Sequence, residues 1–220
     1  MSKAENVSLE DLRTEYTKGG LLKKDVSDNP IDQFNRWFAE AEAAAVLEPN
    51  AMVLATVDQS NRPSARTVLL KGADDRGFRF FTNLESRKAR EIMSNPRVAL
   101  AFHWRELERQ VTINGTVSRT DDDESERYFR RRPYRSQIGA LASKQSRIIE
   151  NRNILDKKEA HPMKRYPTEK EVPFPEFWGG FVVCPLEIEF WQGRECRLHD
   201  RIVFRREGPA AKWETMRLSP

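Results

Sequence analysis

The 220-residue chain has little cysteine, no long apolar run and no marked excess of charge of either sign. Its two cysteines, Cys184 and Cys196, lack Cys-x-x-Cys spacing, so neither a disulfide framework nor a zinc site is indicated. No stretch approaches the roughly 18 apolar residues that a membrane-spanning helix needs. The first twenty residues are charged and lack the apolar core of a secretory signal. These absences predict a soluble, cytoplasmic protein without a metal site.

The charge balance argues against a nucleic-acid partner. The chain has 38 basic and 34 acidic residues, which gives a formal net charge of +4. A nucleic-acid-binding domain usually shows a stronger basic excess that is concentrated on one face. We therefore expect the basic residues to serve small anionic ligands.

Periodicity predicts one amphipathic helix followed by antiparallel strands. Asn29 is a good N-cap before Pro30, and apolar residues then recur at helical spacing. Turn signals such as Asp74 to Gly77 favour hairpins over parallel crossovers, so a closed or nearly closed barrel is expected. The expected strands are 51–57, 65–70, 77–82, 98–104, 110–118, 181–191 and 202–205.

The length fits a single domain over 29–220 after a tail over 1–28, although two small domains are also possible. A helical insertion is expected at about 120–160. Thr120 is predicted to cap a helix over 121–131 that must end near Pro133, and 136–142 is predicted to form a second short helix. The charged stretch 151–172 carries no motif, and we interpret it as a surface excursion.

The segment from Trp191 to Arg201 concentrates arginines, a histidine and an aromatic residue between two alternating, strand-like runs. This pattern predicts a strand end, a turn and a second strand. We expect Arg197 and His199 to alternate along one strand and so to face the same side. The alternative is a charged hairpin exposed to solvent.

A first group of basic residues suits a phosphate. Arg66 and Lys71 lie on a predicted strand, whereas Arg87 and Lys88 follow Ser86 at a predicted helix start. Backbone N–H groups at a helix N-terminus and arginine forks both bind phosphate oxygens. The alternative is that these are ordinary surface charges.

A second group suits another phosphate. Tyr128 and Arg132 are four residues apart on the predicted helix and share a face, with Ser136 just beyond the proline. Together with Lys71 they offer hydroxyl, guanidinium and ammonium donors. A nucleic-acid patch at 130–132 is the alternative, but two neighbouring glutamates would repel a phosphate backbone.

Several motifs occur in one order along most of the chain. The C-terminal run is E-F-W-Q-G-x-x-x-R-L-H-D-R, preceded by W-G-G-F at 178–181 and followed by the end R-L-S-P. Earlier blocks begin near Arg13 and continue at 64–71, 81–88, 108–111, 128–133, 136–140 and 143–146. With these motifs the chain resembles the pyridoxamine 5′-phosphate oxidases, flavin enzymes that make pyridoxal 5′-phosphate.

The resemblance implies a mainly β fold with flanking helices (α+β), an antiparallel split β-barrel, and a homodimer with FMN at the subunit interface. Arg66 and Lys88 would lie at the FMN phosphate. The full set of FMN contacts that the resemblance implies is Arg66, Thr67, Val68, Leu69, Leu70, Lys71, Phe81, Thr82, Arg87, Lys88, Gln110, Gln145, Ser146, Trp191 and Arg201. For Phe81, a backbone contact alone would suffice.

The resemblance also implies oxidation of pyridoxamine 5′-phosphate and pyridoxine 5′-phosphate to pyridoxal 5′-phosphate, with dioxygen reduced to hydrogen peroxide, in vitamin B6 biosynthesis and salvage. The implied catalytic pair is Arg197 and His199. Arg197 cannot act as a base, so we expect it to orient the reacting carbon. His199 accepts a proton, hydrogen-bonds the substrate, or does both. The implied substrate contacts are Lys71, Tyr128, Arg132, Ser136, Arg197 and His199, with Arg13 and Tyr16 as lid residues.

Two alternatives from other classes remain open at this point. A flavin reductase or cofactor-carrying module would use the first basic group only, and the presence of both groups argues against it. A nucleic-acid-binding barrel would be colourless and would bind oligonucleotides with a steep salt dependence.

Overall fold

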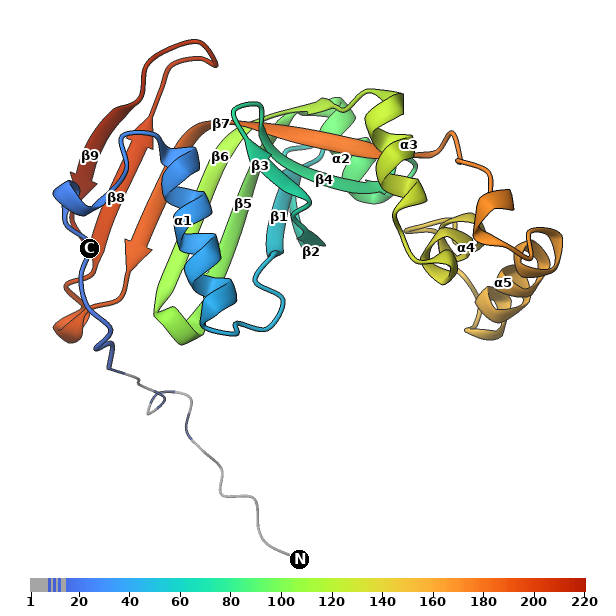
Figure 1. Ribbon diagram of the computed structural model, residues 1–220, viewed down its shortest axis with the longest axis horizontal. Helices are drawn as coiled ribbons and strands as arrows, with labels where there is room; N and C mark the ends of the chain where they lie inside the picture. The colour runs from blue at the N-terminus through green and yellow to red at the C-terminus, as the bar shows by residue number, and fades with distance from the viewer. Residues whose placement is uncertain (1–7, 9, 11, 13–14) are drawn as a thin grey trace, which may run out of the picture.

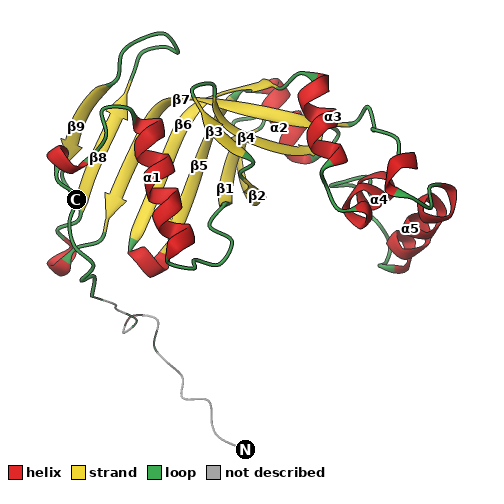
Figure 2. Ribbon diagram, in the orientation of Figure 1, coloured by secondary structure: helices red, strands yellow, loops and turns green. Residues whose placement is uncertain are grey.

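The computed structural model describes residues 8, 10, 12 and 15–220. Within these residues, nine strands form one antiparallel sheet, flanked by helices (Figures 1 and 2). The strands are β1 Ala51–Val57, β2 Pro63–Leu69, β3 Gly72–Asp74, β4 Gly77–Asn83, β5 Arg97–Trp104, β6 Arg109–Arg119, β7 Trp178–Gln192, β8 Asp200–Arg205 and β9 Glu214–Leu218. The helices are α1 Pro30–Ala43, α2 Arg87–Ser94, α3 Asp122–Arg130, α4 Tyr134–Ala142 and α5 Asn153–Arg165.

The sheet divides along its longest strand, β7. The main path is β2-β1-β5-β6-β7-β4-β3, and β8 and β9 continue from β7 outside this path. The first part of β7 pairs with β4 through Val183, and the last part pairs with β8 from Glu187 onward. Pro185, which has no N–H to donate, lies between the two parts. Among the described residues, β2 and β3 are the ends of the paired path and do not pair with each other, so the sheet is open and not the closed or nearly closed barrel expected from the sequence.

The backbones of β6 and β7 approach each other closely opposite Pro185. The pairing of β6 with β7 shifts register between Asn114 and Gly115. A Cβ atom at Gly115 would lie 2.2 Å from the carbonyl oxygen of Cys184, so a side chain there would collide with backbone. The glycine thus permits the irregularity at which β7 changes partners.

Helix α1 covers one face of the sheet (Figure 1) and begins as the sequence predicts. The Asn29 side chain accepts a hydrogen bond from the backbone N–H of Ile31 at 2.9 Å. The Phe34 ring is 1% exposed and packs 4.9 Å from the Phe78 ring and 5.0 Å from the Phe102 ring, measured between centroids. Burial of one such side chain stabilises the fold by roughly 1.5–3 kcal/mol. The contact fixes β4 and β5, which support the sites described below.

All seven predicted strands are present, with bounds that agree within three residues. The prediction missed β3, which has only three residues, and β9, whose sequence mixes charged and apolar residues. Among the described helices, none combines the length and apolarity required to cross a bilayer. Cys184 and Cys196 are free thiols.

The helical region lies beyond the end of the sheet (Figure 2) and differs in detail from the prediction. Asp121, not Thr120, caps α3, because the Asp121 side chain accepts from the N–H of Glu124. Thr120 instead remains bound to the sheet: its N–H donates to the carbonyl oxygen of Gly180 at 3.0 Å. Helix α4 starts at Tyr134, two residues early, and the stretch interpreted as a surface excursion contains α5.

The prediction of a strand through Arg197 and His199 is wrong. Glu195–Arg197 forms a 3-10 turn, and β8 starts only at Asp200. Cys196 and Arg197 have φ angles of 55° and 60°, in the left-handed region. Two left-handed residues break the alternation of a strand, so a shared strand face cannot be the reason that these side chains act together.

Candidate active site

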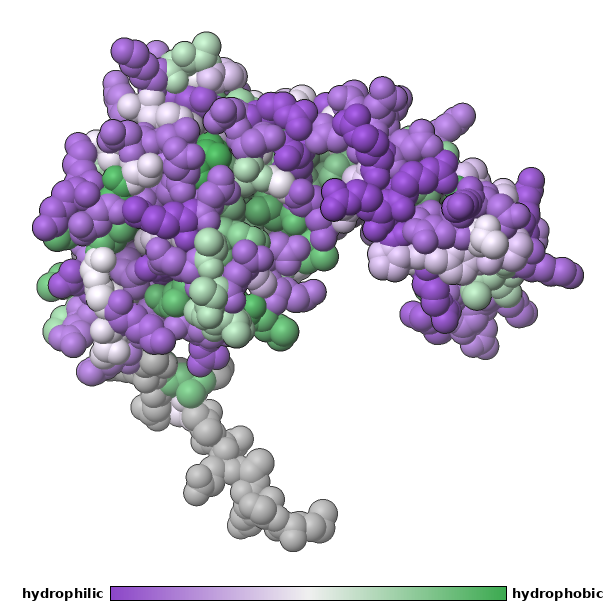
Figure 3. Space-filling view, in the orientation of Figure 1, coloured by the Kyte–Doolittle hydropathy of each residue, from purple (hydrophilic) through white to green (hydrophobic). Residues whose placement is uncertain are grey.

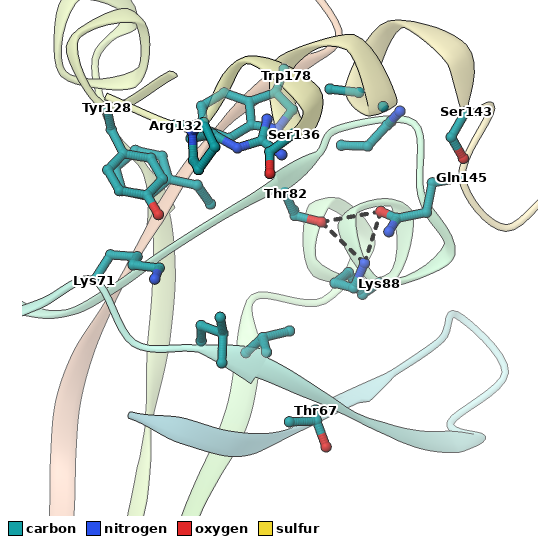
Figure 4. A pocket seen from close by; sticks show the side chains of 17 residues that line it. Thr67, Lys71, Thr82, Lys88, Tyr128, Arg132, Ser136, Ser143, Gln145 and Trp178 are labelled. Carbon is teal, nitrogen blue, oxygen red and sulfur yellow. Dashed lines mark hydrogen bonds between the residues drawn. The ribbon is translucent and has the colours of Figure 1, made fainter. Parts of the chain in front are cut away.

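A cavity of about 650 Å³ lies between β2, β4 and the helices α3 and α4 (Figure 4). It brings together many of the residues that the sequence predicted for a site: Thr67, Val68, Leu69, Lys71, Phe81, Thr82, Lys88, Tyr128, Arg132, Ser136 and Gln145. Its wall also contains residues that sequence reasoning did not assign: Asn83, Pro133, Gly139, Ala140, Ser143 and Trp178. The motif around Trp178 was visible in the sequence, but its partners in the cavity were not.

Lys88 brings a buried ammonium group to this cavity from the first turn of α2. Its Nζ atom lies 3.0 Å from Thr82 Oγ1 and 3.1 Å from Gln145 Oε1 (Figure 4), and 3.3 Å from Ser86 Oγ. These partners are all neutral. Burial, together with the positive charge of Arg66, lowers the pKa of Lys88 to about 8. A buried cation with neutral partners is stabilised by an anion that enters the cavity.

Glu91, which sequence reasoning missed, holds the two neighbouring arginines. Its Oε2 atom accepts from Arg66 Nη2 at 3.1 Å, and its Oε1 atom accepts from Arg87 Nε at 2.7 Å. The hydroxyls of Thr56 and Ser64 also donate to Oε2, at 2.5 and 2.6 Å. Burial alone would raise the pKa of Glu91, but hydrogen bonds from the two hydroxyls and Arg87 lower it to about 2. The i, i+4 spacing of Arg87 and Glu91 was the signal in the sequence.

Arg66 is more constrained than the sequence suggested. Its Nη1 atom donates to the Leu54 carbonyl oxygen at 3.1 Å and to Thr56 Oγ1 at 2.5 Å. Its Nη2 atom donates to Ser64 Oγ as well as to Glu91. Only the Nε–H of its five donors has no bond of this kind among the described residues, so Arg66 mainly contributes a fixed positive charge beside Lys88.

The opposite wall of the cavity is aromatic and carries Arg132. The Phe81 ring lies 4.2 Å from the Tyr128 ring and 5.5 Å from the Trp178 ring, and the three rings are nearly parallel. The guanidinium carbon of Arg132 is 5.0 Å from the Trp178 ring centroid. Arg132 Nη1 is buried and has no hydrogen-bond partner among the described residues. An unpaired buried donor costs about 1–3 kcal/mol, a cost that an anionic ligand would remove.

Lys71 and Ser136 complete what we call the Arg132 group, namely Lys71, Tyr128, Arg132 and Ser136. All four line the cavity, and Figure 4 shows their side chains around one part of it. The Lys71 ammonium nitrogen lies 5.9 Å from the Tyr128 ring centroid. Burial lowers the pKa of Arg132, but a guanidinium group remains protonated at ordinary pH. The group therefore offers cationic and hydroxyl donors to one anion.

Trp191, His199, Arg197 and Tyr16, here called the turn group, lie elsewhere. They line a second cavity of about 420 Å³ at the turn between β7 and β8. The Trp191 and His199 rings are 4.6 Å apart, and the Tyr16 ring lies 5.6 Å from each of them. His199 Nδ1 accepts from the backbone N–H of Arg194 at 3.1 Å, so a neutral His199 carries its proton on Nε2.

The remaining predicted residues are placed around these two cavities. Gln110 and Arg201 are the register partners of Trp191 on the strands to either side, and Arg201 forms an ion pair with Glu189. Ser146 Oγ accepts from the N–H of Arg87 at 3.1 Å at the start of α2. Leu70 is buried. Arg13 lies outside the described residues.

The two groups do not meet within one chain. The two cavities share no lining residue. Helices α3 and α4 lie at one end of the molecule in Figure 1, whereas the junction of β7 and β8 lies at the other. The sequence prediction treated both groups as parts of one site, and a single protomer does not bring them together.

Comparisons with known proteins identify the family of the chain. A family model described as pyridoxamine 5′-phosphate oxidase matches residues 38–160, and one described as the pyridoxine 5′-phosphate oxidase C-terminal dimerisation region matches 178–220. The pyridoxine/pyridoxamine 5′-phosphate oxidase of Rubrobacter xylanophilus is 55% identical, over 96% of each chain. The one from Salinibacter ruber is 53% identical over 96% of this chain and 99% of its own.

Solved structures resemble the chain as well. PhzG from Burkholderia lata, solved in complex with tetrahydrophenazine-1-carboxylic acid, superposes with a TM-score of 0.84 at 31% identity, over 91% of this chain and 98% of its own. An FMN-binding protein related to pyridoxamine 5′-phosphate oxidase, from Nostoc punctiforme, has a TM-score of 0.68 at 15% identity over 85% of this chain and 97% of its own, which supports the fold alone. The identities, their coverage and the family model together establish that the chain belongs to the pyridoxamine 5′-phosphate oxidase family of oxidoreductase enzymes.

Proposed function

We propose that this protein is an FMN-dependent oxidase that converts pyridoxamine 5′-phosphate and pyridoxine 5′-phosphate to pyridoxal 5′-phosphate, reducing dioxygen to hydrogen peroxide, in vitamin B6 biosynthesis and salvage. The observation that carries the proposal is one cavity with two cationic walls, Lys88 on one and Arg132 on the other. Each has a buried donor group that lacks an anionic partner among the described residues. Two phosphorylated ligands that react with each other, a cofactor and a substrate, fit such a cavity.

The residues on the Lys88 side suit the phosphate of FMN. Lys88 would bind the phosphate directly, with the fixed charge of Arg66 behind it and Arg87 at the start of α2. The other cofactor contacts are those that the resemblance implied, within a split-barrel domain over 29–220. The Phe81 ring packs against the Tyr128 and Trp178 rings, which leaves its backbone for the cofactor. When bound, FMN accepts the hydride that the substrate carbon loses and passes the electrons to dioxygen.

The Arg132 group holds the phosphate of the substrate. The Arg132 guanidinium and the Lys71 ammonium supply charge, and the hydroxyl of Tyr128 donates a hydrogen bond, as does that of Ser136. The phosphate anchor does not by itself orient the carbon that loses hydride. Other residues must do so. Because an error of about 1 Å in that orientation can cost about a hundredfold in rate, a second contact to the substrate is required.

The turn group supplies this second contact in a homodimer. The matched C-terminal dimerisation region includes Trp191, Arg197 and His199, which do not line the cavity of Lys88 and Arg132 in their own protomer. The junction of β7 and β8 that carries them lies at the other end of the molecule from α3 and α4 (Figure 1). A two-fold symmetric pair places the same surface of each protomer against the other and so can complete two sites at once. Exposed apolar side chains on β1 and β2, where Figure 3 also shows a hydrophobic patch, support such a contact: Val53 and Leu69 are 44% and 37% exposed.

Within the completed site, Arg197 closes over the substrate ring and orients the donor carbon, since its guanidinium cannot act as a base. His199 donates a hydrogen bond from Nε2 while Arg194 holds Nδ1. It can accept a proton at Nε2 only if the ring first releases the proton that is already there. Tyr16 lies against the His199 ring and serves, with Arg13, as a lid over the substrate.

The test is the spectrum of the purified protein and its reaction without oxygen. We expect a yellow protein with about one FMN per chain, whose flavin is bleached on mixing with pyridoxamine 5′-phosphate. Arg197→Ala should slow bleaching about a hundredfold with FMN still bound. A colourless protein would reject the proposal. Bleaching by tetrahydrophenazine-1-carboxylic acid, the compound bound in the PhzG structure, but not by the phosphate ester would reject the proposed substrate.

A further inference from the structure

A short N-terminal segment, residues 16–21, is fastened to the sheet by two carboxylates. The backbone N–H groups of Thr17 and Lys18 both donate to Glu108 Oε2, each at 2.9 Å. Two consecutive N–H groups that converge on one carboxylate oxygen form charge-assisted hydrogen bonds, which are about twice as strong as neutral ones. The side chain of Glu108 therefore determines where this segment leaves the surface.

Asp200 fixes the other end of the segment. Its Oδ2 atom accepts from the N–H of Leu21 at 2.8 Å and from Arg194 Nη1 at 3.1 Å. Arg217 donates both to Asp200 Oδ1 and to the Leu21 carbonyl oxygen. Burial would raise the pKa of Asp200, but these hydrogen bonds lower it, so the carboxylate is charged at neutral pH. Leu21 itself is 4% exposed.

Between these two anchors, the Tyr16 ring rests on a residue without a side chain. A Cβ atom at Gly193 would lie 2.7 Å from Tyr16 Cγ, closer than real Cβ contacts come. The N–H of Gly193 donates to the Glu108 carbonyl oxygen at 2.8 Å. The main chain of Glu108 thus binds Gly193, against which Tyr16 packs. Its side chain binds the residues that follow Tyr16.

The backbone of Glu108 also has an unfavourable conformation. Its φ is 53°, in the left-handed region, where a residue other than glycine costs roughly 1–2 kcal/mol. Asparagine or glycine would adopt this conformation more easily. A glutamate at such a position is explained by what its carboxylate binds, and here that is the Tyr16 segment.

We propose that Glu108 is a positioning residue of the active site: its carboxylate holds segment 16–21 so that Tyr16 covers Trp191 and His199. Asp200 is the second anchor. The motif that contains Glu108 also contains Gln110, a predicted FMN contact, but no cofactor or substrate role falls on Glu108 itself. The inference rests on the proposed function of the turn group as a substrate contact.

Two variants distinguish the contribution of the Glu108 carboxylate from that of its backbone conformation. Glu108→Gly removes the acceptor and relieves the left-handed strain, whereas Glu108→Gln keeps an acceptor oxygen without the charge. Glu106→Gln, on the same turn and exposed, is the matched control. In the full-length protein without substrate, we expect trypsin to cleave after Lys18 about tenfold faster in Glu108→Gly, to an intermediate extent in Glu108→Gln, and at the wild-type rate in Glu106→Gln.

Activity supplies the second arm of the test. We expect Glu108→Gly to lower kcat/KM for pyridoxamine 5′-phosphate by the same factor as Tyr16→Ala, and the double variant to fall no further, because both remove one interaction. Additive losses would overturn the proposal, and so would unchanged cleavage after Lys18 in Glu108→Gly. The cleavage arm needs no substrate, so faster cleavage in a protein that fails to oxidise the phosphate ester would refute the proposed function and leave the anchoring by Glu108 standing.

Discussion

The residues around Lys88 and those around His199 are held in place in opposite ways. Lys88 projects from a helix into a cavity between strands and helices, and the arginines beside it are bound by the buried carboxylate of Glu91. His199 follows a turn with two left-handed residues, and a segment from the other end of the chain lies against it. The first arrangement is pre-organised by regular structure, whereas the second depends on a few backbone hydrogen bonds.

This difference predicts where substitutions act. Around Lys88 and Arg132, a change removes charge from a rigid cavity, so it should alter ligand affinity and leave geometry intact. Around His199, a change alters the conformation of a turn, so it should affect stability and rate together. The predictions below test each side, from the largest expected effect to the smallest.

Arg132→Ala should have the largest effect. Loss of two charge-assisted hydrogen bonds of roughly 2 kcal/mol each weakens phosphate binding on the order of a thousandfold, so the KM for pyridoxine 5′-phosphate should rise accordingly. FMN should stay bound, because its phosphate belongs to the Lys88 side. Steady-state kinetics and the flavin spectrum measure the two effects.

The adjacent, exposed Arg131 provides the matched control for this variant, because it does not line the cavity of Arg132. Arg131→Ala should change KM little. If Arg132→Ala loses FMN and keeps its affinity for substrate, the two cationic walls have been assigned in reverse.

Lys88→Met should have opposite effects on binding and on stability. FMN affinity should fall about tenfold to a hundredfold, as expected for the loss of a hydrogen bond to a charged group. The FMN-free protein should become more stable, because the pKa of Lys88 is lowered to about 8 from its ordinary 10.5, which means that the fold disfavours the charged form. Denaturant unfolding of the FMN-free protein and fluorescence titration with FMN measure the two effects.

The lowered pKa of Lys88 also determines how these effects on stability and FMN affinity depend on pH. Below about pH 8, Lys88 is charged in both the folded and unfolded states, so the full penalty applies; it disappears as pH rises from 8 towards 10.5. The stability gain of Lys88→Met should therefore be largest at neutral pH. FMN affinity of the wild type should be constant from about pH 7, where the phosphate is already a dianion, to about pH 8, and fall above it. A flat profile through pH 10 would remove Lys88 from the phosphate site.

Sequence patterns predicted the rigid side of the comparison better than the turn. The cap at Ser86 before Lys88 and the strand that carries Thr82 are local features, and the structure brings Lys88 and Thr82 to one cavity. Tyr128 and Arg132 line the same cavity, but they do not share a helix face as predicted, because α3 ends at Arg130. Glu91 escaped prediction because its four partners come from three separate elements, β1, β2 and α2. Only folding places Thr56 and Ser64 beside it.

The strand prediction at the turn between β7 and β8 was wrong for a different reason. Alternation of polar and apolar residues is the evidence for a strand, and Arg197-Leu-His199 alternates by chance within a turn. Neither of the two left-handed positions, Cys196 and Arg197, is a glycine, the residue that would have signalled such angles. Separation of the turn group from the cavity could not be foreseen either, because it depends on how β7 divides the sheet.

Glu91→Gln should distinguish orientation from net charge on the rigid side. If charge alone mattered, removal of a negative group would strengthen the binding of a phosphate. We expect FMN affinity to fall instead, by about tenfold or less, because Arg66 and Arg87 lose the carboxylate that orients them. Riboflavin, which lacks the phosphate, should bind the variant as well as it binds wild type. Tighter FMN binding would mean that the carboxylate only offsets charge.

The effect of Glu91→Gln on stability should depend on pH. The pKa of Glu91 is lowered to about 2, below its ordinary 4.5, so the charged carboxylate stabilises the fold above pH 4.5 and this stabilisation is lost as pH falls towards 2. Glu91→Gln should therefore be less stable than wild type at pH 7, and the difference should shrink in acid. Urea unfolding at pH 7 and pH 3 measures it.

Cys196→Gly should have the smallest effect and tests the turn side. The φ of Cys196 is 55°, which glycine adopts freely, so relief of roughly 1–2 kcal/mol of strain opposes the extra backbone entropy that glycine brings to the unfolded chain, about 0.4–1 kcal/mol. We expect a net gain of about 0–1.6 kcal/mol, and each 1 kcal/mol raises Tm by roughly 2–4 °C in a domain of this size. Cys196→Ser keeps the strain and is the matched control. If the glycine variant instead melts lower than the serine variant, the left-handed turn is not the conformation that holds Arg197 and His199 in solution, and the contrast between a rigid cavity and a strained turn fails at this point.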